Sequence, residues 1–195
     1  AIRSEFNLDD KLVVGSVGRL DTPKNFAVFV ESAALLLPKN PNLVFMLIGG
    51  GPLEAELSER MQTLGIAHRF IMTGWRSDAR QLIQAFDIFV STSLQESFGN
   101  VLIEAGHAGI PVIAPAVDGI PEAVADRKTG LLLTPTEPAT RPRASLATPM
   151  PKFSLRASTL ISPLSLDPKI LAEAIAHLLE RPDLRQQYGY AGQIQ

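Results

Sequence analysis

The chain has 195 residues, of which 46% are hydrophobic and 19% are charged, and its formal net charge is −2. This balance suits a globular domain with a buried core and excludes the basic surface of a nucleic-acid-binding protein. The chain contains no cysteine, which excludes disulfides, thiolate metal sites and a cysteine nucleophile, and fits a reducing, cytoplasmic compartment.

Short apolar runs alternate with amphipathic patterns along the chain. Runs of this kind predict strands at 12–18, 43–48, 69–73, 88–91, 111–114 and 130–133. Apolar residues at three- and four-residue steps predict helices at 26–37, 53–64, 79–85, 99–108 and from Asp167 to Leu179. No apolar run is long enough to cross a bilayer. The alternation predicts an α/β fold with a Rossmann-like doubly wound parallel sheet, whose ligands bind at loops that follow strands.

The segment from Pro138 to Leu166 interrupts this alternation. It has five prolines, no Asp, Glu or Gly, and neither helical nor strand periodicity. It carries four cationic residues, Arg141, Arg143, Lys152 and Arg156. Two interpretations stay open, a solvated insertion or a basic flap that contacts an anionic lipid-linked acceptor or a membrane surface.

The segment from Glu96 to Ala105 carries the strongest chemical pattern. It follows a predicted strand and opens a predicted helix, where unpaired backbone amides and the helix dipole favour an anion such as phosphate. Gly99 allows a ligand to approach this backbone closely. Glu96 and Glu104 on either side would repel phosphate unless they bind neutral hydroxyls, so they point to a ligand with both phosphates and sugars. The alternative is that they are unrelated surface carboxylates.

Two cations are expected at the same sheet edge. Arg19 follows the first predicted strand and Lys24 precedes the next helix, where they would complement a diphosphate. Either could instead be a solvent-exposed charge. The glycine run Gly49-Gly50-Gly51-Pro52 is a weak dinucleotide signal, because Glu54 stands where G-x-G-x-x-G requires its last glycine.

Together these motifs resemble the C-terminal domain of the group 1 (family 4) retaining glycosyltransferases, which have the two-domain GT-B fold. The resemblance extends from about Val13 to Pro135 and resumes at Asp167. The matching motifs are Val17-Gly18-Arg19-Leu20 with Lys24, Leu47 to Pro52, the E-x7-E element from Glu96 to Glu104, Ala108 to Ala114, Gly119-Ile120-Pro121-Glu122 and Thr129 to Leu132.

The resemblance implies a role for each part of the site. Arg19 and Lys24 would hold the diphosphate of a nucleotide-sugar donor, Glu104 the ribose and Glu96 the transferred sugar, so that Glu96, Arg19 and Lys24 would act in catalysis. The remaining donor-binding positions would be Gly18, Gly49, Gly50, Ser97, Phe98, Gly99, Asn100 and Val101, with Gly74, Trp75 and Arg76 beside the base. Trp75 would stack on the base or simply pack. No metal or other cofactor is expected, because basic groups and helix amides neutralise the leaving diphosphate.

Two positions depart from the family pattern. Asp118 stands where the family has the first of two glycines, which leaves the donor sugar open. Asn25 replaces the glycine that commonly follows the lysine. The segment 138–166 is atypical, and the N-terminal acceptor domain is expected to lie outside residues 1–195.

We therefore expect a domain that binds a UDP-hexose, such as UDP-glucose, as the donor half of a retaining transferase. The parent enzyme would transfer a hexose to a growing glycan or a lipid-linked acceptor in polysaccharide or glycolipid synthesis. It would work in the cytoplasm or at the inner face of the membrane. Two alternatives are a nucleotide-sugar-binding module without turnover and a dinucleotide-binding oxidoreductase domain.

Overall fold

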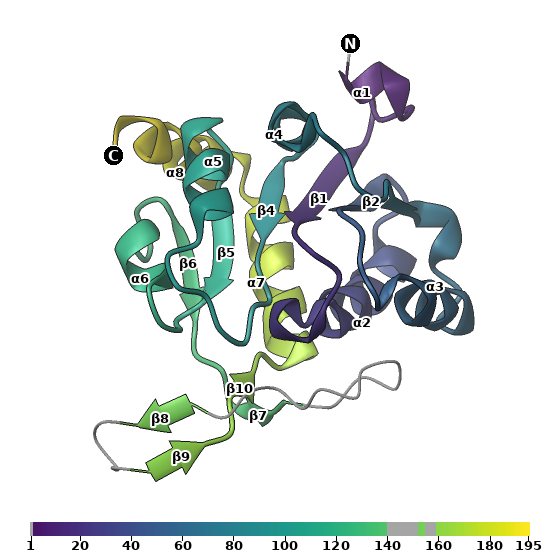
Figure 1. Cartoon of the computed structure of the whole chain (residues 1–195). Helices are drawn as coiled ribbons and strands as arrows, with labels where there is room; N and C mark the ends of the chain where they lie inside the picture. Colours follow the sequence, from purple (N-terminus) through teal and green to yellow (C-terminus); the bar gives the residue numbers. More distant parts are fainter. Residues whose placement is uncertain (1, 140–151, 155–158) are drawn as a thin grey trace.

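The computed structural model describes residues 2–139, 152–154 and 159–195 (Figure 1). Its centre is a six-stranded sheet with the strand order β3-β2-β1-β4-β5-β6, in which every neighbouring pair is parallel. The strands are β1 Leu12–Val17, β2 Leu43–Ile48, β3 Phe70–Met72, β4 Ile88–Val90, β5 Val112–Pro115 and β6 Gly130–Leu133. The predicted Rossmann-like α/β fold is confirmed, with strand ends within one residue of the predicted ones.

Helices cover both faces of the sheet, as the ribbon in Figure 1 shows. One face packs against α2 Phe26–Leu36, α3 Glu54–Thr63 and α7 Pro168–Glu180. The other face packs against α4 Ala79–Leu82, α5 Asn100–His107 and α6 Ile120–Ala123. Helix α1 Ile2–Glu5 lies at the N-terminus, α8 Pro182–Ile194 follows α7, and short 3-10 turns occupy Thr22–Lys24, Leu37–Lys39, Ala67–Arg69 and Ile83–Ala85. None of the helices in the described ranges is both long and apolar enough to cross a membrane.

The two cores follow from the alternation of side chains along each strand. Val13 and Met46 face the α4–α5 layer, whereas Val14 and Phe45 face the α2–α7 layer. All six residues of β2 are buried, as expected for a central strand covered on both faces. On the α2 side, the ring of Phe29 lies 5.2 Å from that of Phe45, centroid to centroid. The loops that follow the strands are therefore anchored in a rigid, close-packed core.

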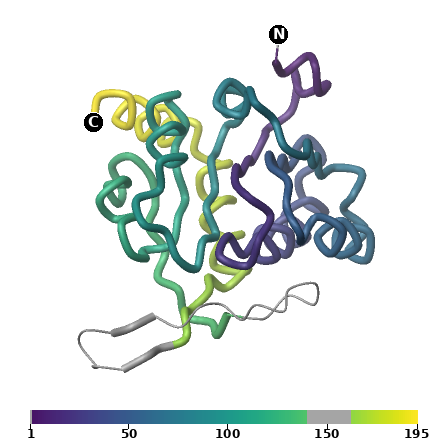
Figure 2. The backbone as a smooth tube through the Cα atoms, viewed as in Figure 1, coloured from purple at the N-terminus to yellow at the C-terminus, as the bar shows by residue number. Residues whose placement is uncertain are grey.

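The segment from Pro138 to Leu166 is the main correction to the predicted secondary structure. Strand β7 Glu137–Pro138 pairs antiparallel with β10 Leu164–Ser165, and β8 Lys152–Ser154 pairs with β9 Thr159–Ile161. Strands of two or three residues are too short to leave a periodic pattern, so the absence of strand periodicity did not mean an absence of strands. In Figure 2 the chain leaves the sheet after β6 toward β7, and it returns through β10 to α7.

The basic-flap interpretation of this segment is not tested by the structure. Arg141, Arg143 and Arg156 lie outside the described residues, as does the side chain of Lys152. The described end of the segment is part of the domain, because Ser165 and Leu166 are buried. The stem of the segment is therefore anchored in the fold.

Helix α8 Pro182–Ile194 was not predicted, and it fixes the helix that opens the site. It packs against α5 and α7. A Cβ atom on Gly189 would lie 2.0 Å from the carbonyl oxygen of Gly109, just beyond α5, and one on Gly192 would lie 3.0 Å from the Cα of Gly106. The missing side chains let the two helix backbones touch, which holds α5 in place.

Replacing Gly189 with alanine should destabilise the protein. In an exposed helix the change would stabilise by about 0.5–1 kcal/mol, but here the new methyl group collides with backbone, and overpacking costs roughly 1–3 kcal/mol. Urea unfolding monitored by circular dichroism measures the difference. Gln186→Ala, on the exposed side of the same helix, is the control and should leave the free energy of unfolding nearly unchanged. Equal stability of Gly189→Ala and the wild type would contradict the close contact.

Candidate functional site

The site lies where the strand order changes direction. Strand β1 has β2 on one side and β4 on the other, so the connections after β1 and β4 leave the sheet in opposite directions and open a crevice at its carboxyl edge. Three loops meet there, at 18–25 after β1, 91–99 after β4 and 116–119 after β5. The first two of these loops contain Arg19, Lys24 and Glu96, which the sequence predicts to bind phosphate and sugar.

The loops after β1 and β4 are fastened together by hydrogen bonds. The amide of Leu94 donates to the carbonyl of Pro23 at 2.8 Å, and the hydroxyl of Thr92 donates to the carbonyl of Lys24 at 2.8 Å. Thr92 and Leu94 are buried. Because the two acceptors are the carbonyl groups of Pro23 and of Lys24 itself, the Lys24 backbone has a fixed position relative to the loop after β4.

Lys24 and Glu96 form an ion pair across these two loops. The Lys24 Nζ lies 2.5 Å from Glu96 Oε2, and the two side chains are 25% and 18% exposed. A pair this sheltered is screened less by salt than a surface pair. Lys24, predicted to bind the diphosphate, and Glu96, predicted to bind the transferred sugar, are therefore in direct contact.

Helix α5 begins beside this pair. Its N-cap is Gly99, with a φ of 80°, in the left-handed region that glycine adopts without a steric penalty. The first amides of a helix have no intrahelical acceptors, and the helix dipole makes this end positive. The start of α5 therefore offers an anion site next to the Lys24 ammonium group.

A cavity of about 370 Å³ opens between these elements. It collects nine of the fifteen predicted donor-binding residues, together with Val17. The nine are Gly18, Lys24, Glu96, Ser97, Phe98, Gly99, Asn100, Val101 and Glu104. Cationic, anionic and amide groups thus line one hollow, with Glu96 before the start of α5 and Glu104 within the helix.

Arg19 is next to the cavity but does not line it. Its side chain is 74% exposed, and its Nε lies 3.4 Å from Asp21 Oδ2. The neighbouring Gly18 does line the cavity together with Glu104. Arg19 is therefore adjacent in sequence to the cavity lining, and its guanidinium group lies beside Asp21.

The glycine run after β2 packs against the loop after β1. The amide of Gly49 donates to the carbonyl of Gly74 at 3.0 Å. A Cβ atom on Gly49 would lie 1.9 Å from the carbonyl oxygen of Gly18, so this glycine allows β2 to end directly against the loop after β1. Gly50 lies against Trp75, which is 78% exposed. Gly49, Gly50, Gly74 and Trp75 are therefore adjacent to one another and absent from the cavity lining.

Arg76 makes contacts away from the cavity. Its guanidinium group donates to Asp78 at 2.7 Å and to Glu5 at 3.2 Å, and lies 5.9 Å from the ring centroid of Phe6. The hydrogen bonds to Asp78 and Glu5 raise the pKa of Arg76, and the hydrogen bond from Arg76 lowers the pKa of Asp78. Any stability from the Asp78 contact is present above the ordinary carboxyl pKa and is lost as the pH falls through the lowered one. These contacts join the N-terminal segment to the loop after β3.

Asp118 belongs to the site, although the sequence marked it only as a departure from the family pattern. The amide of Glu96 donates to Asp118 Oδ2 at 3.0 Å. Asp118 has a φ of 45°, in the left-handed region. A second hollow, of about 580 Å³, lies on this side of the Lys24–Glu96 pair and is lined by Asp21, Pro23, Lys24, Gln95, Glu96, Ser97 and Asp118. The signal in the sequence that could have identified Asp118 was an aspartate at a position where the family pattern has glycine.

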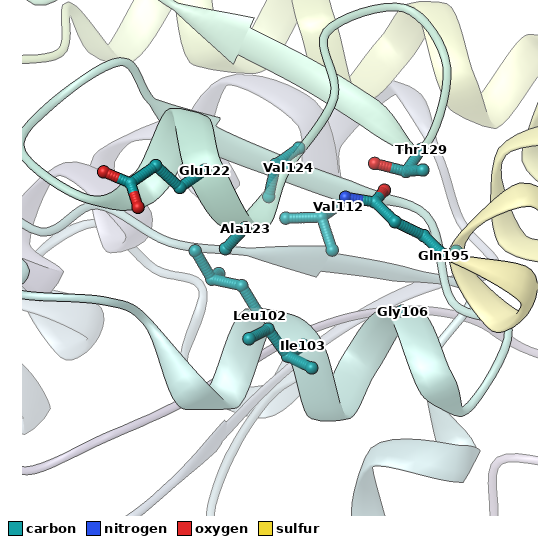
Figure 3. A pocket seen from close by; sticks show the side chains of 10 residues that line it. Leu102, Ile103, Gly106, Val112, Glu122, Ala123, Val124, Thr129 and Gln195 are labelled. Carbon is teal, nitrogen blue, oxygen red and sulfur yellow. The ribbon is translucent and has the colours of Figure 1, made fainter.

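A different cavity, of about 150 Å³, lies at the amino ends of β5 and β6 (Figure 3). Leu102, Ile103 and Val112 supply an apolar wall, and Thr129 lies close to Gln195 in this view. Among the described residues that line it, Glu122 is the one charged side chain. It therefore lacks the cations that a phosphate ligand needs, in contrast to the cavity at the start of α5.

No group of three or more His, Asp or Glu side chains with metal-binding geometry occurs within residues 2–139, 152–154 and 159–195. In the part of the chain that the structure describes, the cation in the cavity lining is Lys24.

The chain is similar to known proteins in sequence and in fold. A family model described as "Glycosyl transferases group 1" matches residues 1–141. The chain is 42% identical over 142 residues to a D-inositol 3-phosphate glycosyltransferase of Mycobacteroides abscessus, covering 68% of this chain and 31% of that protein. It is 34% identical over 125 residues to the Vi polysaccharide biosynthesis protein VipC/TviE of Salmonella typhi, covering 64% and 22%.

A similar fold occurs in a solved structure. The Anabaena protein Alr3699/HepE, crystallised with UDP and glucose, superimposes with a TM-score of 0.78 at 24% identity, over 99% of this chain and 45% of that chain. The chain thus spans less than half of this neighbour and about a third or less of the two curated relatives.

The residue that follows Lys24 gives a test of how its loop is held. Asn25 has a φ of 49°, and its Nδ2 donates to Ser165 Oγ at 2.7 Å in a buried contact. Ser165→Ala leaves this amide without its acceptor, and should lower the free energy of unfolding by about 1–3 kcal/mol. Denaturant titration measures the loss. Ser58→Ala on α3 removes the same hydroxyl group elsewhere and should cost little; a Ser165→Ala loss no larger than that of Ser58→Ala would contradict the contact.

Proposed function

Because the chain belongs to the group 1 glycosyltransferases, we propose that it binds a nucleoside-diphosphate sugar as the donor half of a retaining hexosyltransferase. The donor is a UDP-hexose such as UDP-glucose. The observation that supports this most directly is the single cavity that joins Lys24, the start of α5, Glu96 and Glu104. Its groups match the parts of such a donor in kind and in order.

The diphosphate binds between Lys24 and the first amides of α5. Both present donors with positive charge, and charge-assisted hydrogen bonds to phosphate are the strong ones. The exposed, flexible side chain of Arg19 turns from Asp21 toward the same phosphates, since Gly18 beside it already lines the cavity. When the glycosidic bond to phosphate breaks, these groups stabilise the charge that develops on the departing UDP.

The two glutamates bind the sugars on either side of the diphosphate. Glu104, within α5, accepts hydrogen bonds from the ribose hydroxyls, and Glu96 accepts them from the transferred hexose. Carboxylates beside a diphosphate are tolerated because they face neutral hydroxyl groups, which donate to them. Trp75, exposed in the loop after β3, covers the base together with Gly74 and Arg76; the identity of the base is part of the proposal.

Relatives support this choice of donor and pathway. HepE has the same fold and was crystallised with UDP and glucose, and the VipC/TviE relative is named for polysaccharide biosynthesis. The acceptor, a growing glycan or a lipid-linked saccharide, binds to an N-terminal GT-B domain of the parent enzyme. The parent enzyme transfers the hexose with retention of configuration at its anomeric carbon, in the cytoplasm or at the inner face of the membrane. Lys24 and the helix amides supply the neutralising charge, so the reaction needs no metal.

A second candidate function concerns the chain by itself. The chain spans 31% and 22% of the two curated relatives, which favours a donor-binding module that does not complete transfer alone. Repeated turnover of UDP-glucose by this chain, measured as released UDP, would refute the module. The oxidoreductase alternative is disfavoured, because the glycine run follows β2 rather than the first strand of the fold, and Glu54 stands where the dinucleotide motif requires its last glycine.

Lys24→Met should weaken the binding of UDP and of UDP-glucose alike. The change removes the ammonium group and keeps much of the side-chain volume, so the diphosphate loses a charge-assisted contact, at a cost of roughly 10- to 100-fold in Kd. Calorimetric titration in the presence of a chelator measures both affinities without divalent cations. Lys128→Met, at an exposed lysine, is the control and should bind both ligands as the wild type does. Unchanged affinities in Lys24→Met would overturn the proposed diphosphate site.

Glu96→Gln should affect the binding of UDP-glucose and of UDP differently. Its carboxylate is proposed to contact only the hexose, so the Kd of UDP-glucose should rise by roughly tenfold while that of UDP stays constant or falls, since Lys24 loses a competing anion. The same titrations give the ratio of the two affinities. Glu122→Gln, at an exposed position of α6, is the matched control. An equal loss for both ligands would place Glu96 at the nucleotide instead of the sugar.

A further inference from the structure

Both main-chain groups of Glu96 are held by the turn that follows β5. The Glu96 amide donates to Asp118 Oδ2 at 3.0 Å, and the Gly119 amide donates to the carbonyl of Glu96 at 3.2 Å. The first bond is made by a side chain, so it depends on the identity of residue 118. The second is backbone to backbone and would survive most substitutions.

The turn presses against the loop of Glu96. A Cβ atom on Gly119 would lie 2.2 Å from the carbonyl oxygen of Ser97, which leaves no room for any other residue. Asp118 adopts a left-handed conformation, with a φ of 45°. Non-glycine residues in this region cost energy and persist where the surroundings hold them in place. Aspartate tolerates it better than most residues, so the position can combine this backbone with a hydrogen-bond acceptor.

The opposite side of the Glu96 loop is fixed as well. Leu94, two residues earlier, donates to Pro23, and the Glu96 carboxylate contacts Lys24. Glu96 therefore lies between two turns, one after β1 and one after β5, and its carboxylate can take few positions. Asp118 is the side chain that completes this arrangement from the β5 side.

We propose that Asp118 is a positioning residue, which holds Glu96 so that its carboxylate meets the hydroxyls of the transferred sugar. The proposal rests on the donor function proposed above. Asp118 acts through the Glu96 amide, and its effect therefore falls on the sugar part of the donor. It should not alter the binding of the nucleotide, which contacts Lys24, α5 and Glu104.

Two substitutions of Asp118 separate the acceptor oxygen from the backbone conformation. Asp118→Asn keeps an Oδ acceptor, and both asparagine and glycine tolerate a positive φ. Asp118→Gly removes the acceptor. In calorimetric titrations, Asp118→Gly should raise the Kd of UDP-glucose about fivefold and change the Kd of UDP by less than about twofold. Asp118→Asn should leave both Kd values near those of the wild type. Asn7→Gly, at another non-glycine residue with positive φ (55°), is the control and should alter neither affinity.

An equal loss of affinity for UDP and for UDP-glucose in Asp118→Gly would show a general loosening of the site and overturn the proposal. So would an Asp118→Asn variant that behaves like Asp118→Gly, because the acceptor would then not matter. Hydrogen exchange at the Glu96 amide, followed by NMR without ligand, tests the contact independently of the donor. Exchange should be faster in Asp118→Gly and nearly unchanged in Asp118→Asn. Unchanged exchange in Asp118→Gly refutes the positioning role, whereas a wild-type chain that binds neither ligand refutes the donor function.

Discussion

The contact between Lys24 and Glu96 is the constraint on which the rest of the site depends. The two residues lie in loops after different strands, and their approach to 2.5 Å requires those loops to be fixed relative to each other. The parallel sheet brings both loops to its carboxyl edge, and the hydrogen bonds from Thr92 and Leu94 complete the alignment. The pair then forms the shared wall of two hollows, one toward α5 and one toward Asp118.

Under the proposed function, the ion pair also explains how a site with several carboxylates could accept an anionic donor. Without ligand, Lys24 offsets the charge of Glu96, so neither is left as an unpaired charge in a partly buried position. A diphosphate that reaches Lys24 competes with Glu96 for the same ammonium group. Hydroxyl groups of the sugar can then donate to the freed carboxylate oxygens. The amides of α5 matter in this exchange because they add positive potential that Glu96 does not neutralise.

The sequence predicted what depends on local pattern and sheet topology. Buried strands such as Leu43–Ile48 and the chain order of helices and strands were predictable, as was the convergence of Lys24 with the segment from Glu96 to Glu104. The directions of long side chains were not, because Arg19 and Arg76 are drawn to nearby carboxylates, Asp21 and Asp78, that a family motif does not include. Contacts made by glycine backbones, such as α8 against α5, leave no apolar periodicity to detect. The Asp118 contact depends on a turn conformation that spacing alone does not reveal.

The segment 138–166 is joined to the site through its stem. Asn25, directly after Lys24, donates to Ser165 in β10, and β10 pairs with β7 at the start of the segment. Both side chains are buried, so this hydrogen bond cannot be exchanged for water without moving the backbone. Two residues on, Asp167 accepts the amide of Lys169 and caps α7, whose apolar face is part of the main core. The loop of Lys24 is thus held by a contact with β10, as the loop of Glu96 is held by a contact with the turn after β5. We therefore expect any shift of Lys24 toward a ligand to be made by its side chain rather than by its loop.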